Sequence, residues 1–134
     1  MTAEFLSLNQ LDYSGTEAVN TLCTNLSFTG KNTKIIMVTS SQASEGKTFL
    51  SVHLMRALAQ LGKSVVLVDA DLRKSILNTR FNVRLPREAK GLTHYLAGMS
   101  PQEAVLYDTN IPNAFYVPVG RTVSNSLALL NTPM

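Results

Sequence analysis

Two apolar runs of strand length flank one helical stripe, and together they give the clearest pattern in the chain. Residues 34–39 are apolar with β-branched character, which predicts a strand buried on both faces. From Lys47 onward apolar residues recur at helical spacing up to Gly62, where a helix would end. Residues 65–68 predict a second buried strand. Strand, loop, helix and strand in this order form a βαβ unit with a right-handed crossover.

Weaker patterns lie on both sides of this unit. Residues 1–13 show no clear period and predict a flexible lead-in, so that one domain would span residues 14–134. Five further elements are predicted: a helix opening at a capping box in residues 14–17, a short helix within 91–98, a helix with Ser100 as N-cap, a strand at 114–119 that ends at Pro118 or lies at an edge, and a last helix over 124–130.

Composition restricts the class of protein. The 134 residues are 45% hydrophobic and 16% charged, which suits one folded domain and excludes a disordered chain. The net charge of +3 is spread along the chain, so no nucleic-acid partner is expected. The single cysteine, Cys23, cannot form an internal disulfide, and neither a secretory signal nor a transmembrane run is apparent. These features predict a cytoplasmic location.

The loop between the first strand and the helix carries the strongest chemical signal. Its sequence, Ser41-Gln42-Ala43-Ser44-Glu45-Gly46-Lys47-Thr48, matches the phosphate-binding pattern G-x-x-x-x-G-K-[ST], with Ser41 replacing the first glycine. Backbone N–H groups of such a loop and the positive end of the helix hold phosphates. Gly46 leaves room for a phosphate, Lys47 supplies a positive charge to the β- and γ-phosphates, and the Thr48 hydroxyl is a ligand for Mg²⁺.

This motif predicts a nucleoside triphosphate site that extends from Ser41 through Phe49. The alternative is an ordinary turn between a strand and a helix. The context favours the phosphate loop, because the motif stands at a predicted strand-to-helix junction, as the loop requires.

Two carboxylates follow the second strand directly. Asp69 and Asp71 stand at its carboxyl end, the edge where ligands bind in open α/β sheets. Asp69 would hold Mg²⁺, directly or through water, and Asp71 would accept a proton from an attacking hydroxyl. Arg73 would pair with a phosphate or a carboxylate. The alternative is a solvated turn in which Asp71 caps a helix.

Other reactive side chains favour structural roles. Cys23 lies on the apolar face of its predicted helix, which indicates burial. His53 and His94 have no partner at the spacing of metal ligands. The four tyrosines are scattered, and Tyr95 and Tyr116 fit packing positions.

Several motifs together resemble the bacterial tyrosine kinases that regulate capsule and exopolysaccharide synthesis. Val66-Leu67-Val68-Asp69-Ala70-Asp71-Leu72-Arg73 is similar to the second Walker motif of that family, and this is the most specific match. The loop ending in Gly46-Lys47-Thr48 resembles its phosphate loop. Further similarities cover Thr24-Asn25-Leu26 with Phe28, Gly91-Leu92-Thr93 with Leu96-Ala97-Gly98, Val117-Pro118-Val119-Gly120, and Leu129-Leu130-Asn131-Thr132-Pro133-Met134.

The resemblance implies a P-loop NTPase-like three-layer α/β fold with a mostly parallel sheet, and an autokinase that transfers the γ-phosphoryl group of ATP to tyrosine. Lys47 and Thr48 would then bind ATP and Mg²⁺, Asp69 would serve the metal, and Asp71 would be the base. A membrane adaptor protein would be the activating partner and would bring the chain to the inner face of the membrane. Two alternatives are a ParA/MinD-like partitioning ATPase and a non-catalytic fragment that only binds nucleotide. The lysine that partitioning ATPases carry early in the loop is Gln42 here, which favours the kinase.

The chain departs from the family pattern in three ways. Ala43 and Ser44 replace the usual proline and glycine of the loop. The segment from Glu17 lacks the two arginines that mediate ring assembly, so rings are not expected. An apolar strand ending in D-T-P-P and a tyrosine-rich tail would lie beyond Met134, so the sequence predicts an N-terminal part of the kinase domain, incomplete at its C-terminus. Such a part would be of limited stability or would need a partner chain.

Overall fold

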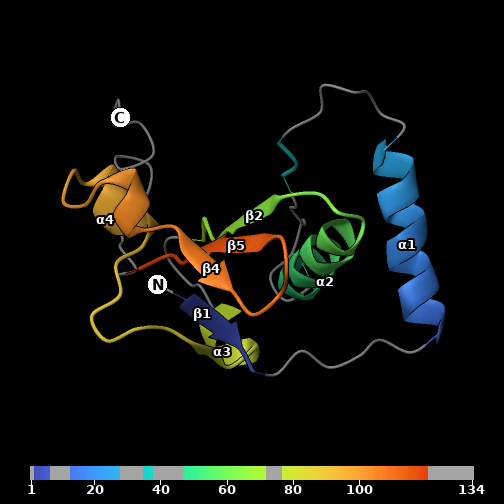
Figure 1. Cartoon of the computed structure of the whole chain (residues 1–134), viewed down its shortest axis with the longest axis horizontal. Helices are drawn as coiled ribbons and strands as arrows, with labels where there is room; N and C mark the ends of the chain where they lie inside the picture. The colour runs from blue at the N-terminus through green and yellow to red at the C-terminus, as the bar shows by residue number, and fades with distance from the viewer. Residues whose placement is uncertain (1, 7–12, 28–34, 38–46, 72–76, 121–134) are drawn as a thin grey trace.

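The computed structural model describes residues 2–6, 13–27, 35–37, 47–71 and 77–120 (Figure 1). Its strands are β1 (Thr2–Phe5), β2 (Val65–Val68), β3 (Val83–Arg84), β4 (Tyr107–Thr109) and β5 (Ala114–Val117). Its helices are α1 (Tyr13–Ser27), α2 (Lys47–Gln60), α3 (Leu77–Arg80) and α4 (Leu92–Leu96), with a 3₁₀ turn at Gln102–Ala104.

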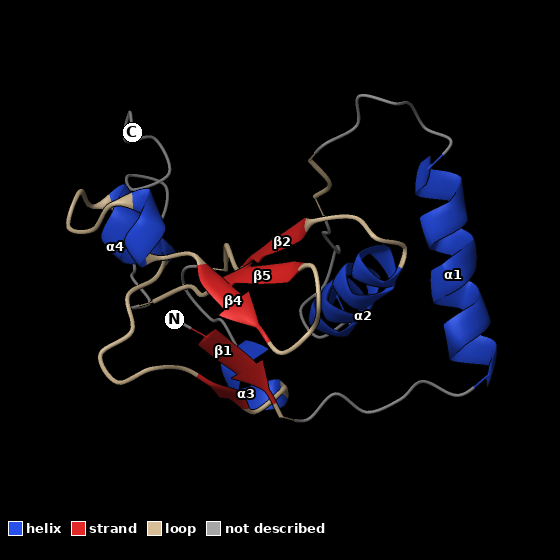
Figure 2. Ribbon diagram, viewed as in Figure 1, coloured by secondary structure: helices blue, strands red, loops and turns tan. Residues whose placement is uncertain are grey.

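The strands form one mixed sheet in the order β2-β5-β4-β1-β3 (Figure 2). β2 pairs with β5 and β1 pairs with β4 in parallel, whereas β4–β5 and β1–β3 are antiparallel pairs. The α/β class predicted from the sequence is confirmed. The antiparallel pairs join β4 to β5 and β1 to β3, and the apolar pattern did not indicate β1, β3 or β4. β3 and β4, with two and three residues, hold too few residues to show a period.

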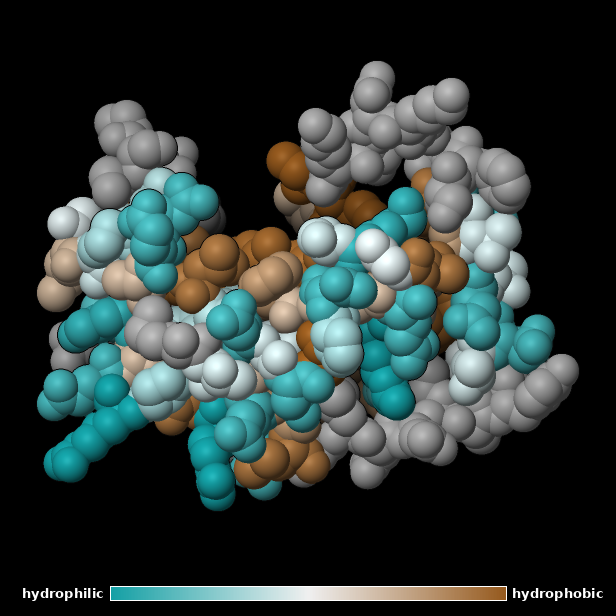
Figure 3. All heavy atoms as spheres, in the orientation of Figure 1, coloured by the Kyte–Doolittle hydropathy of each residue, from teal (hydrophilic) through white to brown (hydrophobic). Residues whose placement is uncertain are grey.

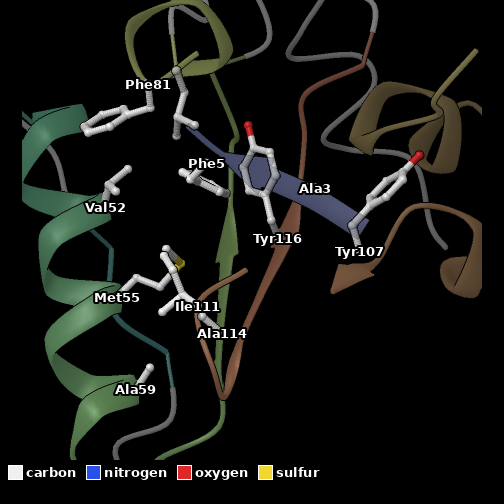
Figure 4. Packing of buried hydrophobic residues seen from close by; sticks show 11 residues of the cluster. Ala3, Phe5, Val52, Met55, Ala59, Phe81, Tyr107, Ile111, Ala114 and Tyr116 are labelled. Carbon is white, nitrogen blue, oxygen red and sulfur yellow. The ribbon is translucent and has the colours of Figure 1, made fainter. Parts of the chain in front are cut away.

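Helix α2 lies between the sheet and α1 (Figure 1), and it buries apolar side chains on both sides. Toward the sheet, Val52, Met55 and Ala59 join the main core with residues of β1, α3, β4 and β5 (Figure 4). Toward α1, Leu54 and Ala57 form a second cluster together with Val19, Leu22, Cys23, Leu26 and Leu58. Burial of α2 on two sides makes it the element that connects α1 to the sheet.

The C-terminal end of α2 is fixed by glycine. Gly62, with φ of +87°, donates from its N–H to Ala59 O at 3.0 Å, and Lys63 N donates to Leu58 O at 3.3 Å. These two bonds are the Schellman arrangement that ends a helix at a left-handed residue. The predicted stop at Gly62 is confirmed. The Asn113 amide also donates to Ala59 O at 3.3 Å, which places this end of α2 beside the start of β5.

The N-terminal residues are part of the sheet. Ala3 and Phe5 of β1 are buried in the main core. The Asn110 side chain extends the pairing of β1, because its Oδ1 accepts from Phe5 N at 2.8 Å and its Nδ2 donates to Phe5 O at 3.2 Å. A lead-in without regular structure was predicted for residues 1–13, and Thr2–Phe5 form a strand instead. This strand is ordered by Asn110, which is 105 positions away, and the local sequence pattern cannot reveal such a partner.

The strand predicted at 34–39 is not present in its described part, and the second strand is buried on one face only. Residues 35–37 have no regular structure, and Ile35 is 91% exposed. In β2, Val65 and Leu67 pack on the main core, whereas Val66 and Val68 are 49% and 46% exposed. Figure 3 shows hydrophobic residues at the surface where Figure 1 places β2 and residues 35–37. A strand is buried on both faces only where other elements cover each face of the sheet. In the described structure α2 covers one face of β2.

Other predicted elements have mixed outcomes. The helices at residues 18–26 and within 91–98 and the strand ending before Pro118 are confirmed. The helix expected after Ser100 is a single 3₁₀ turn whose N-cap is Pro101, without a side-chain cap. Residues 124–130 lie outside the described part of the chain, as does the Ser14 side chain of the predicted capping box.

Close approach of two glycines lets α4 dock on the chain that leaves β5. Leu92 N donates to Pro118 O at 2.8 Å. A Cβ atom on Gly91 would lie 2.4 Å from Gly120 N and 2.5 Å from Pro118 O. These are backbone atoms, so a side chain at this position forces the backbone segments apart.

We therefore expect Gly91→Ala to lower the free energy of unfolding by about 3 kcal/mol, the upper end for overpacking. Gly98→Ala is the control. Its Cβ would meet open space, and its φ of +76° alone should cost about 1 kcal/mol. Urea denaturation of both variants measures the difference, and equal losses would contradict the close approach.

Candidate functional site

The first turn of α2 and the carboxyl end of β2 lie at the same end of the sheet. A connection of four residues, 61–64, joins α2 to β2, so the two elements run antiparallel. The far end of α2 is fixed beside the start of β5 by the bond from Asn113 to Ala59. Thr48 in the first turn of α2 is therefore on the side of the sheet where Asp69 follows β2.

The predicted loop is only partly within the described chain. Residues Ser41 to Gly46 and the side chain of Lys47 lie outside it, so their predicted roles stay predictions. Lys47 begins α2, which agrees with a helix that starts at the loop motif. Thr48 is half-buried. Phe49, which ended the predicted nucleotide segment, is partly exposed and its ring lies 4.3 Å from that of His53.

The first of the two carboxylates after β2, that of Asp69, is held by the backbone. Asp69 is 7% exposed and its N–H donates to Val117 O at 3.0 Å, which continues the pairing with β5. Its carboxylate accepts from Asp71 N at 3.2 Å. This bond fixes a tight turn and holds the Asp69 side chain at the strand end. Asp71 is half-buried.

The donor set at this end of the sheet fits magnesium. Thr48 and Asp69 offer hard oxygen atoms from two adjacent elements. Among the described residues no group of three His, Cys, Asp or Glu side chains could hold a metal alone. Mg²⁺ is commonly held by one or two protein ligands together with phosphate oxygens and water, so such a cage is not required.

A buried tyrosine and an asparagine stand next to this site. The Tyr116 hydroxyl donates to Asn78 Oδ1 at 2.6 Å. Burial, and to a lesser extent the charge of Asp69, raise the pKa of Tyr116 far above its ordinary value. Sequence reasoning assigned Tyr116 to packing and did not single out Asn78. No local pattern signals this pair, because 38 positions separate its members.

His53 is buried among aromatic rings. It is 3% exposed, and its ring lies 4.3 Å from the Phe49 ring and 6.2 Å from the Phe81 ring. Its Nε2 atom is buried without a hydrogen-bond partner in the part of the chain described. Burial lowers the pKa of His53, and the charge of Arg56 lowers it further. Both effects favour the neutral form of the side chain in the folded protein.

This burial predicts a loss of stability in acid. The unfolded chain protonates His53 near its ordinary pKa of 6.5, whereas the folded chain does so at lower pH. The unfolded state thus binds more protons as the pH falls below that value, and the free energy of unfolding decreases. Thermal melting between about pH 8 and about pH 5 measures the effect. His53→Leu should flatten the dependence of the melting temperature on pH. His94→Gln is the control and should keep the part of that dependence that His53 causes. If the melting temperature of His53→Leu depends on pH as strongly as that of the parent, the assignment to His53 is wrong.

The remaining candidates have structural surroundings. Cys23 is buried between α1 and α2, as predicted, and burial raises the pKa of its thiol. His94 Nδ1 accepts from Gly91 N at 3.0 Å and so takes part in the start of α4. Within the described ranges, no helix combines the length and the apolar character needed to cross a membrane.

Comparison with known proteins supports a nucleotide-binding domain. The model of the CobQ/CobB/MinD/ParA nucleotide binding domain family matches residues 36–125. This range includes the phosphate-loop motif, Asp69 and Asp71.

Curated relatives carry the name of a tyrosine-protein kinase. The chain is 39% identical over 114 residues to tyrosine-protein kinase CpsD of Streptococcus agalactiae, covering 85% of this chain and 49% of the relative. It is 40% identical over 116 residues to CpsD of Streptococcus pneumoniae, covering 87% and 50%. The chain thus spans about half the length of these relatives.

A solved structure shares the architecture. The kinase domain of the Escherichia coli tyrosine kinase ETK superposes with a TM-score of 0.82 at 32% identity, covering 96% of this chain and 50% of that one. These similarities confirm the resemblance to bacterial tyrosine kinases that the motifs predicted.

Proposed function

This chain belongs to the family of CobQ/CobB/MinD/ParA nucleotide binding domains, and on that premise we propose that it is the ATP-binding part of a bacterial tyrosine autokinase. The observation that carries the proposal is the junction of α2 and β2. Thr48 lies in the first turn of α2, Asp69 and Asp71 follow the end of β2, and both lie at the same end of the sheet. The curated names of the relatives supply the reaction class.

Each residue has a distinct task in this proposal. Amides of residues 41–46 and the Lys47 ammonium bind the phosphates of ATP. Thr48 and Asp69 hold Mg²⁺, which when bound neutralises charge on the phosphoryl group in transfer. Asp71 accepts the proton of the tyrosine hydroxyl, whose oxygen forms the new bond to the γ-phosphorus while ADP leaves.

The cellular setting follows from the same proposal. The autokinase would act in capsule or exopolysaccharide synthesis from the cytoplasmic side, with a membrane adaptor protein as activator. Self-association in rings is not part of the proposal, because the segment from Glu17 to Cys23 carries no arginine.

Two measurements on the purified chain test the proposal. Calorimetry with ATP and Mg²⁺ should detect nucleotide binding. Incubation with Mg·ATP, with and without a candidate adaptor, followed by an anti-phosphotyrosine blot, should detect a signal that Asp71→Asn removes while ATP binding remains. ATP hydrolysis without phosphotyrosine would favour a partitioning ATPase, and binding without turnover would favour a fragment that only holds nucleotide. Absence of ATP and ADP binding would reject the proposed site.

A further inference from the structure

The Tyr116 hydroxyl is an unusual polar group in the main core. Tyr116 is 0% exposed, and its ring packs on the Phe5 ring edge to face, with centroids 5.2 Å apart (Figure 4). A phenylalanine would fill the same space among apolar neighbours. A buried hydroxyl costs free energy unless it is hydrogen-bonded, so its single bond to Asn78 has to offset that cost.

That bond joins two elements next to the candidate site. Tyr116 is in β5, the strand that pairs with β2, and Asn78 is in α3, the first helix described after Asp71. The donor–acceptor distance of 2.6 Å is short for a neutral pair. The bond therefore fixes α3 against the strand beside the two carboxylates.

Asp69 lies on the same face of the sheet as Tyr116. In the parallel β2–β5 pair, Leu67 lies opposite Tyr116, and residues two apart along a strand share a face. Asp69 is two residues beyond Leu67, and its N–H still bonds to β5. The phenol thus stands beside a buried carboxylate, and it gives its only proton to Asn78.

We propose that Tyr116 and Asn78 are a positioning pair, which holds Asp69 at the strand end in the orientation that Mg²⁺ of a bound nucleotide requires. Asn78 accepts the phenol proton, so the hydroxyl does not take an acceptor site of the neighbouring carboxylate. The same bond joins α3 to β5, the strand whose Val117 carbonyl accepts from Asp69 N. This inference rests on the proposed function, because it assigns the pair to the magnesium site of that function.

The test is a magnesium titration of nucleotide binding with a fluorescent ATP analogue. For Tyr116→Phe the Mg²⁺ concentration at half-maximal binding should rise about tenfold, as is typical when a group that orients a metal ligand is removed. Binding of the analogue in EDTA should not change. Asn78→Ala should give the same shift from the other side of the bond, and the double variant should be no worse than either single one.

Tyr107→Phe is the matched control. Tyr107 is also buried, at 1% exposure, and its hydroxyl donates to Lys90 O at 2.8 Å. It lies in β4, which is not paired with β2. The Tyr107 hydroxyl also accepts from Lys90 N at 3.0 Å, so its loss should lower the melting temperature at least as much as Tyr116→Phe and leave the magnesium titration unchanged.

The outcomes separate the inference from the proposed function. If Tyr116→Phe and Tyr107→Phe give the same titration, or if Tyr116→Phe weakens binding equally in EDTA, the pair is a structural bond only and the inference is wrong. Should Tyr116→Phe fail to fold, the half-buried Asn78→Ala decides by the same readout. A parent chain that binds no nucleotide rejects the proposed function and this inference together.

Discussion

Lys47→Ala should weaken ATP binding by about 10- to 100-fold, the equivalent of one charge-assisted hydrogen bond of about 1.5–3 kcal/mol. Lys47 belongs to the loop motif and begins α2, where its ammonium would meet the β- and γ-phosphates. Alanine is a good helix former and keeps the helix start. The expected change is therefore in affinity and not in fold, and isothermal titration with Mg·ATP measures it.

Lys63→Ala controls for the loss of one positive charge. Lys63 is exposed in the connection after α2, at the end of the helix away from the site. Its replacement should leave ATP affinity within about twofold, as expected for a distant and screened charge. Equal losses in the two variants would mean that the affinity depends on net charge, and a Lys47→Ala chain that binds ATP normally would contradict the phosphate loop.

Phe5→Ala should lower the free energy of unfolding by about 3–5 kcal/mol, a large share of the total for a domain of this size. The ring is buried in the main core and contacts the Tyr116 ring. Its removal leaves a cavity between β1 and β5, while the two backbone bonds of residue 5 to Asn110 remain. Chemical denaturation followed by circular dichroism measures the loss.

Leu6→Ala is the matched control for Phe5→Ala. Leu6 is the next residue, is 47% exposed, and keeps its backbone bond to Asn82 in the variant. Its truncation should cost less than about 1 kcal/mol. If Phe5→Ala were equally mild, β1 would be a loosely attached segment, as the sequence had predicted for residues 1–13.

Local patterns explain what the sequence predicted correctly. The stripe of α2, its stop at Gly62 and the run of β2 depend on neighbours in the chain, so a single sequence carries them. The start of a helix at Lys47 and the placement of Asp69 directly after β2 follow from the same local order. The order of these elements, which brings the start of α2 and the end of β2 to one end of the sheet, was therefore accessible without coordinates.

Long-range partners explain what the sequence did not predict. β1 is ordered by β4, β3 and Asn110, all of them distant in the chain. The bond between Tyr116 and Asn78 likewise depends on the approach of β5 to α3. For residues 35–37 the sequence predicted a strand that the described structure does not contain. Their local pattern is strongly apolar, but no described element covers them. The apolar pattern of a segment indicates which element it favours, and packing against distant segments determines whether that element forms.

The position of α1 on the outer side of α2 has a consequence for the order of opening. When α1 detaches, it uncovers Leu54 and Ala57 of α2 but leaves the cluster on the sheet side intact. The amide protons of α1 should therefore exchange with deuterated solvent through a partial opening, whereas those of α2 should exchange only through global unfolding. The chain would lose its outermost layer first and keep the strand ends around Asp69 assembled.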